Sequence, residues 1–403
     1  MGRVWGAKGG ADDFWASFEL AERLEDDRRF AELLALTDQL LAHGAAWTPA
    51  FGEHMGRVHR YRLVSLGELG RGPEAWAHFG VVLSQFLAAP QAGDSVRVLR
   101  QTMGDILLRL GHDGPAQELF ALALADSRAN ASPADTVELE STIAAIEVNA
   151  GRYAEADRRL DALTSRLAIM QIAEEQRARL RALVLWMQVV VRNGQERFRE
   201  AEQVGVAAVA ACVAHEGPGG DVGRNARIAR ARALVELGRA YEAETECRLV
   251  LAHEIDVDEP AYAGQLCVLR TVLGRAFTVQ RRHDQAVADL EAAVADGCRS
   301  LGAGDPLTLD AVLALMAARR ARGGADDAGE VLRLLETAVR EGEAGPDSGH
   351  PLVGAARERF GEAKFRVQAE AAGMAPVRPW RARVQPGLRP CWNCGGTIWH
   401  DHK

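Results

Sequence analysis

The stretch LGRAYEAETEC, residues 237–247, decides the fold because its pattern recurs along most of the chain. A glycine or polar turn is followed by a residue that is often aromatic, then by an alanine, and then by an apolar run. The same phrase appears as LGRGPEAWAHF (69–79), LGHDGPAQELF (110–120), NAGRYAEADRRL (149–160), RFREAEQV (197–204), RRHDQAVADL (281–290) and GGADDAGEVL (323–332). Such self-similarity indicates a repeat protein.

We call the position of the recurring alanine in each copy its anchor, and the spacing of successive anchors gives the period of the repeat. The anchors are Leu33, in a divergent first copy, and Ala75, Ala116, Ala156, Ala201, Ala243, Ala286 and Ala328. Successive anchors lie 42, 41, 40, 45, 42, 43 and 42 residues apart. We therefore expect eight units of about 42 residues, each resting on its neighbours.

Each unit is predicted to form two antiparallel helices, because apolar residues recur at spacings of three and four on both sides of the turn. Prolines stand where the first helices would begin, a position that tolerates the missing amide donor; they are Pro49, Pro133, Pro260, Pro306 and Pro351. Small residues recur twelve places before the anchor, as Gly104, Ala144, Ala231 and Gly274. Small residues at two facing positions predict closely packed helix pairs in an all-α fold.

These positions resemble the tetratricopeptide repeat, which has a small residue in its first helix, a polar turn, and Ala followed by a large apolar residue in its second. Residues 302–324 are similar to the 42-residue subclass found in kinesin light chains and in the sensor arms of bacterial regulators. The resemblance covers roughly residues 25–370 and implies a right-handed superhelical solenoid. The chain departs from the pattern at Arg192, Gly205 and Arg230.

The expected organisation has four parts. Residues 1–24 form an N-terminal segment and cap, and residues 25–372 form about eight repeats plus a capping helix. A linker rich in Pro and Arg follows at residues 373–390, and a C-x-x-C/H-x-H tail occupies residues 391–403.

Composition excludes several classes of function. A formal net charge of −8 disfavours general binding to nucleic acid or to an anionic membrane. The sequence has no signal-peptide h-region and no long apolar span, so we expect a cytoplasmic protein. Cysteines standing singly in helical text, namely Cys212, Cys247, Cys267 and Cys298, are expected to be reduced core thiols. The oligomeric state is left open.

Catalytic motifs are missing from the repeats, so we expect no enzyme. Neither a nucleophile elbow nor a zinc-protease helix motif occurs, and the glycines before Lys8 lack the spacing of a phosphate loop. Aromatic residues at helical spacing are more often core than ligand cage. We therefore interpret Trp76, Phe79, Phe120 and Trp186 as packing residues.

Basic residues recur in the first helices, which line the concave groove in tetratricopeptide arrays. Arg100, Arg227 and Arg270 each lie sixteen residues before an anchor, as does His59. Nearby basic residues on the same helices are Arg57, Arg97, Arg224 and Arg275. Two interpretations stay open: a groove that grips an acidic segment or a C-terminal carboxylate, or arginines that are solvated or salt-bridged.

The sequence therefore favours a non-enzymatic scaffold or adaptor that binds a protein or peptide in its groove. A regulator that senses a peptide or another ligand is the alternative. A redox or zinc-dependent activity of the tail is a third hypothesis, disfavoured because about thirty residues leave little room to build a pocket around a dithiol.

The tail contains the one set of residues typical of a metal site. Cys391 and Cys394 are separated by two residues, and His400 and His402 follow closely. Zinc accepts tetrahedral sets of thiolate and imidazole ligands, so these four side chains could hold one ion; an unliganded flexible end is the alternative.

If zinc binds, the purified chain should contain about one zinc per molecule under reducing conditions. The paired variant Cys391→Ser, Cys394→Ser should contain none, because serine hydroxyls do not replace thiolates as ligands. Metal analysis of both proteins decides the question. Equal, sub-stoichiometric zinc in the two samples would leave the tail as a docking peptide.

Overall fold

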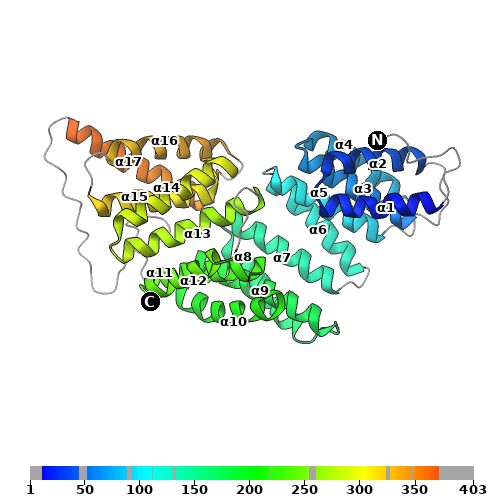
Figure 1. Ribbon diagram of the computed structural model, residues 1–403, viewed down its shortest axis with the longest axis horizontal. Helices are drawn as coiled ribbons and strands as arrows, with labels where there is room; N and C mark the ends of the chain where they lie inside the picture. Colours follow the sequence, from blue (N-terminus) through cyan, green and yellow to red (C-terminus); the bar gives the residue numbers. More distant parts are fainter. Residues whose placement is uncertain are drawn as a thin grey trace. The chain divides into compact units, whose positions relative to one another are not determined.

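The computed structural model describes residues 11–44, 52–88, 93–110, 112–129, 133–217, 219–253, 260–323, 327–345 and 348–371. Within these ranges the chain forms helices and no strands (Figure 1). The helices are α1 (Ala11–Asp26), α2 (Phe30–Gly44), α3 (Gly52–Glu68), α4 (Gly72–Leu87), α5 (Gly93–Arg109), α6 (Asp113–Ala129), α7 (Pro133–Asn149), α8 (Tyr153–Leu167), α9 (Glu174–Gly194), α10 (Phe198–Glu216), α11 (Asp221–Glu236), α12 (Ala240–Leu251), α13 (Pro260–Val279), α14 (His283–Ser300), α15 (Pro306–Arg322), α16 (Asp327–Ala344) and α17 (Pro351–Ala371).

The predicted all-α array of helix pairs is confirmed. Pairs α1/α2 to α15/α16 each carry one anchor in the second helix, and α17 follows the last pair. Four of the five prolines begin helices α7, α13, α15 and α17, while Pro49 lies outside the described residues. None of the helices in these ranges has the length and apolar character needed to span a membrane.

The chain divides into two compact units, Met1–Ile143 and Ala144–Lys403, here called unit 1 and unit 2. In each unit a second helix packs against the first helix of the next repeat, as α4 does on α5 and α12 on α13. First helices also pack on one another, α3 on α5 in unit 1 and α11, α13 and α15 in series in unit 2. This pattern is that of a stacked repeat array.

The two helices of a pair pack closely at positions where the sequence has small residues. The anchors Leu33, Ala75, Ala116, Ala156, Ala201, Ala243 and Ala286 are completely buried. Across from them, a Cβ added at Gly104 would lie 2.9 Å from the ring of Phe120, and one added at Gly274 would lie 2.4 Å from Leu290 Cγ. The large side chain of the second helix therefore fills the space that the missing side chain of the first helix leaves.

An arginine clamp begins most second helices. The arginine just before the helix binds the carboxylate or amide three residues later, in the pairs Arg29–Glu32, Arg71–Glu74, Arg197–Glu200, Arg239–Glu242 and Arg282–Gln285. The position lies four residues before the anchor, so the clamp repeats with the fold. Arginine cannot accept a hydrogen bond from the helix amides, so it stabilises the turn through this ion pair or hydrogen bond instead.

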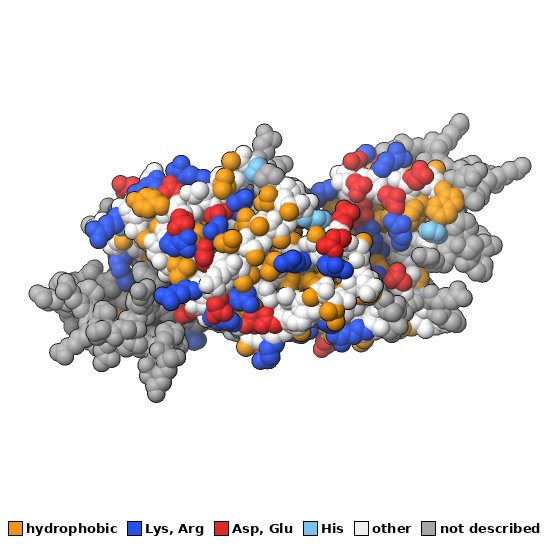
Figure 2. All heavy atoms as spheres, turned by 90° about the horizontal axis from the view of Figure 1, so that it is seen from below, with side chains coloured by type: hydrophobic (Ala, Val, Ile, Leu, Met, Phe, Trp, Pro, Cys, Tyr) orange, Lys and Arg blue, Asp and Glu red, His pale blue; other side chains and the backbone are white. Residues whose placement is uncertain are grey.

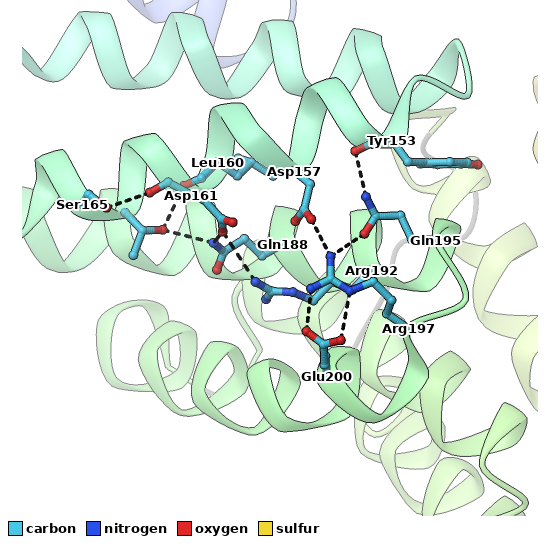
Figure 3. Close-up of polar contacts among 11 residues, drawn as sticks. Tyr153, Asp157, Leu160, Asp161, Ser165, Gln188, Arg192, Gln195, Arg197 and Glu200 are labelled. Carbon is cyan, nitrogen blue, oxygen red and sulfur yellow. Dashed lines mark hydrogen bonds and ion pairs between the residues drawn. The ribbon is translucent and has the colours of Figure 1, made fainter. Parts of the chain in front are cut away.

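Three of these clamps also join successive repeats. One is Arg239, whose Nη1 lies 3.2 Å from Glu202 of the preceding repeat. Arg197 Nη1 donates to Asp157 at 2.5 Å and to Gln195 Oε1 at 2.7 Å, and Gln195 donates to the carbonyl of Tyr153 (Figure 3). Arg282 and Gln280 make the equivalent contacts with Glu244 and the carbonyl of Ala240. A motif Q-x-R-x-x-[EQ] thus fixes the fifth and the seventh repeat, each on the preceding one.

Departures from the repeat pattern are accommodated locally. Gly205 faces Arg230, whose Cγ would lie 2.9 Å from an added Cβ, so the long aliphatic stem of the arginine occupies the space of an apolar side chain. Phe79 and Phe120 are buried and Trp186 is partly buried, as predicted. The prediction for Trp76 was wrong: its side chain is 49% exposed and leans on Phe79.

Replacing Gly274 by Ala should destabilise the chain by about 1–3 kcal/mol, because the new methyl group overlaps Leu290. The matched control is Gly361→Ala on an exposed face of α17, where an added Cβ meets nothing within 4 Å. That change should stabilise by up to about 1 kcal/mol through helix propensity. Urea unfolding measures both; a Gly274→Ala variant as stable as the control would disprove the close packing.

Candidate functional site

The three predicted ladder arginines all bind acids of their own repeat. Arg100 Nη1 lies 2.6 Å from Asp126, Arg227 Nη1 lies 2.8 Å from Glu246, and Arg270 Nη1 lies 2.8 Å from Asp296. Each arginine is on a first helix and each acid on the second helix of the same pair. These guanidinium groups therefore enter any partner complex already ion-paired.

Two further predicted arginines occupy one register position, nineteen residues before their anchors. Arg97 pairs with Asp94 at 2.8 Å and with Asp135 of the next first helix at 3.2 Å. Arg224 likewise pairs with Asp221 and reaches Gln265 of the next first helix at 3.3 Å. Both side chains are buried, so they link neighbouring repeats.

Arg57 and His59 lie on α3 in unit 1. Arg57 pairs with Glu22 at 2.7 Å on an exposed surface. His59 Nδ1 lies 3.2 Å from His78 Nε2. Burial lowers the pKa of His59 to about 4, and burial together with His59 and Arg62 lowers that of His78 to about 4. The two imidazoles are thus neutral and share one hydrogen bond at physiological pH.

Contact with a partner stays a prediction for these residues. On the face shown in Figure 2, Lys and Arg side chains lie interspersed with Asp and Glu side chains among hydrophobic ones. This mixture agrees with the ion pairs above.

Arg275, the last predicted groove residue, forms the centre of a buried cluster in unit 2. Its Nη2 lies 2.5 Å from Asp310 on α15, and only 14% and 11% of the two side chains are exposed. Burial acts to raise the pKa of Asp310, but Arg275 and Arg232 outweigh it and hold that pKa below its usual value. Arg275 Nη1 is buried and has no hydrogen-bond partner among the described residues.

Four more side chains interact electrostatically with this pair. Arg232 and Glu236 come from α11, Tyr153 from the start of α8, and His350 from the residue before α17. Burial raises the pKa of Glu236 against the opposing charges of Arg275 and Arg232. Burial likewise raises the pKa of Tyr153 and lowers that of His350. We call these six residues, Tyr153, Arg232, Glu236, Arg275, Asp310 and His350, the inner-face cluster.

The cluster lies on the concave side of unit 2. Tyr153 and Asp310 belong to repeats four units apart, and in a stacked array such distant repeats approach one another only across the inside of the coil. The turn before α8 also lies against the start of α17, since a Cβ added at Gly151 would be 2.8 Å from Pro351 Cδ. The coil of unit 2 therefore brings its ends together around these side chains.

Several groups of the cluster have unused hydrogen-bonding capacity. No other described residue forms a hydrogen bond or ion pair with the Glu236 carboxylate or the Tyr153 hydroxyl, and both side chains are partly exposed. The carboxylate can accept and the hydroxyl can donate or accept, so the two offer both kinds of hydrogen bond in one place. Within the described ranges no three His, Cys, Asp or Glu residues group as metal ligands. The predicted ligands Cys391, Cys394, His400 and His402 lie outside those ranges.

Sequence reasoning missed most of this cluster, although one signal was present. Arg232 and Arg275 occupy the same register position, eleven residues before the anchors Ala243 and Ala286. Tyr153 is the aromatic residue of its turn, and its ring packs over Gly194 of the next repeat. Glu236, Asp310 and His350 have no register in common, so only the coiling of the repeats reveals that they meet.

Comparisons with known proteins identify the fold. No family model and no curated protein matches the chain. Among solved structures, a Rap protein complexed with competence and sporulation factor matches with a TM-score of 0.51 and 10% identity, over 89% of this chain and 100% of that one. The apo form of RapI matches with a TM-score of 0.53 and 6% identity, over 88% and 98%. The chain is a tetratricopeptide-like helical repeat protein. The apo quorum sensor NprR from B. thuringiensis is also similar, with a TM-score of 0.51, 13% identity and coverage of 79% and 85%.

Two conservative substitutions in the cluster of this tetratricopeptide-like protein should change stability in opposite directions. Asp310→Asn leaves the buried charge of Arg275 without a counter-ion and should cost about 3–5 kcal/mol at pH 7. Glu236→Gln should instead stabilise at pH 7, because the folded state raises the pKa of Glu236 and so disfavours its ionised form.

The pH dependence checks the sign. The gain from Glu236→Gln should vanish as the pH falls below about 4, because the glutamate then becomes protonated in both states, and should grow as the pH rises above that value. The loss from Asp310→Asn should shrink as the pH falls below about 4. Urea unfolding of the three proteins between pH 3 and pH 8 measures both trends. The unfolding is measured in 1 M salt, which screens ion pairs made by exposed arginines. Destabilisation by Glu236→Gln at pH 7 under these conditions would contradict the description of the cluster.

Proposed function

We propose that the chain is a non-enzymatic scaffold or adaptor that binds a peptide or an extended protein segment on the concave side of unit 2. The inner-face cluster carries this proposal, because helices α8 and α11 bring the partly exposed Tyr153 hydroxyl and Glu236 carboxylate, both with unused hydrogen-bonding capacity, to one place. A peptide backbone presents amide donors and carbonyl acceptors together, so it can donate to Glu236 and accept from the Tyr153 hydroxyl at once.

A ligand-sensing regulator is the second candidate, and it is favoured by the number of repeats that the cluster joins. A segment that contacts Tyr153, Glu236 and Asp310 binds three repeats simultaneously and would stabilise one curvature of the coil over others. Two similar structures agree with this role in their own proteins, one being a complex with a competence and sporulation factor and the other a quorum sensor.

The acidic partner expected from the sequence would have to compete with the chain's own acids. Arg100 and Arg227 are 12% and 14% exposed in their ion pairs, whereas Arg270 is 31% exposed. A carboxylate of the partner would therefore bind most readily at Arg270, by sharing it with Asp296.

The raised pKa values of the cysteines in the repeats agree with a role that involves no redox chemistry. Burial raises the pKa of Cys212 to about 11 and that of Cys267 to about 12, and it raises that of Cys247 further, so these thiols are poor nucleophiles. Cys298 is exposed, which corrects the expectation of a core thiol, and its pKa is also raised by burial of the sulfur. A cytoplasmic location is part of the proposal.

The substitution Tyr153→Phe tests the inner-face cluster as a binding surface, because it removes only the hydroxyl group. The immobilised full chain is used to capture partners from a lysate of the source cells, and the recovered partner is then titrated in purified form. Loss of one hydrogen bond should weaken its affinity about 2- to 10-fold.

Tyr241→Phe is the matched control, because that side chain is 72% exposed on α12 and makes the same chemical change elsewhere in unit 2. Its affinity should equal that of the unchanged chain. A partner that binds Tyr153→Phe and Tyr241→Phe equally well would place the binding surface away from the inner-face cluster.

A further inference from the structure

The C-terminal residues differ in charge from the rest of the chain. Residues 372–403 contain Arg378, Arg381, Arg383, Arg389 and Lys403 against a single acid, Asp401, giving a formal charge of +4. Because the whole chain carries −8, residues 1–371 carry −12. The charge contrast favours docking of the C-terminal segment on the repeats of its own chain.

Unit 2 offers an acid that such an arginine fits. The Glu236 carboxylate is partly buried, makes no hydrogen bond or ion pair with another described residue, and interacts electrostatically with the further acids Asp310 and Glu196. A guanidinium group would supply two parallel donors to this carboxylate, which Arg275 and Arg232 influence electrostatically without donating to it. Arg275 cannot fill this role through Nη2, which binds Asp310.

The length of the segment allows the contact. Helix α17 starts beside the cluster at His350 and Pro351 and has 21 residues, so it carries the chain about 31 Å away along its axis. Arg381 lies ten residues beyond Ala371, and an extended chain spans at most about 33–36 Å over that distance. Arg381 is therefore just able to return to the start of α17, and Arg383 and Arg389 have length to spare.

We propose that residues 381–389 of the same chain dock on the inner-face cluster, with an arginine on Glu236, and so occupy the surface that a partner would use. The proposal goes beyond the proposed function, resting only on the cluster being a binding surface. A tether of this length gives an effective concentration on the order of millimolar, so a contact that is weak between separate molecules suffices to keep the segment docked. The segment then acts as a built-in competitor.

Trypsin reports docking directly in the full chain. It cleaves after Arg381 and Arg383, which precede Ala382 and Val384, whereas Arg378 and Arg389 precede prolines and resist cleavage. The rate of cleavage is measured by mass spectrometry at a trace concentration of trypsin and at low salt. This rate is proportional to the fraction of molecules in which the segment is undocked, because proteolysis tracks the population of the open form.

Glu236→Gln should speed cleavage after Arg381 and Arg383 about 3- to 10-fold, since the docked state loses its charged acceptor. The control Glu336→Gln removes the same charge from an exposed position on α16 and should leave the rate unchanged. Salt near 1 M should bring the unchanged chain to the rate of Glu236→Gln. Circular dichroism verifies that each variant is folded.

A second variant keeps the test independent of Glu236. Arg381→Gln should speed cleavage after Arg383, because one of the docking arginines is lost. The proposal is overturned if the unchanged chain and Glu236→Gln are cleaved equally fast at low salt, or if protection rises with protein concentration, which would indicate a second copy as the occupant. Such a result, with Tyr153→Phe still weakening partner capture, would leave the proposed function standing.

Discussion

The structure depends on one packing constraint, the close approach of the two helices in each pair. Phe120 and Leu290 lie directly over Gly104 and Gly274, and the fully buried anchor alanines allow the same approach from the second helix. Interiors packed to crystal density do not tolerate an added methyl group at such positions. Each pair is therefore a rigid unit of nearly constant shape, and stacking units of constant shape produces a regular coil.

Charged residues in this coil hold the repeats in register. Arg197 and Arg282 bind acids of the preceding repeat, while Arg97 and Arg224 bind the first helix of the following one. These ion pairs are partly buried and repeat at the period of the fold, so they act as a network along the stack rather than as isolated surface pairs. The many arginines of the chain are therefore largely neutralised by its own acids, and the chain as a whole is acidic.

The fold could be predicted from the sequence because its determinants are local. The anchors, the prolines that begin helices and the small residues at facing positions are all visible within a window of about 42 residues. The predicted groove residues recur with the period of the fold, and their contact with a partner stays a prediction; their ion-pair partners within the chain were not foreseen. Asp126 and Asp296 each stand ten residues after an anchor, a regularity that becomes meaningful only once the pair geometry is known.

The inner-face cluster could not be predicted in the same way. Tyr153 and Asp310 are separated by 157 residues, and their approach depends on the summed rotation of four repeats, to which every interface contributes a small angle. No local pattern encodes that sum. Exposure also depends on the packing of the repeats, as Trp76 shows: its helical spacing is that of a core residue, yet its side chain is 49% exposed.

The contact between Gly151 and Pro351 has an architectural consequence. In an open solenoid each repeat contacts only its neighbours, so repeats can be gained or lost with little effect on those that remain. Unit 2 instead touches itself, the turn before α8 meeting the start of α17. A ring that closes in this manner admits only a whole number of repeats of the right pitch. Its length is thus fixed by geometry, and duplication of a repeat would open the ring.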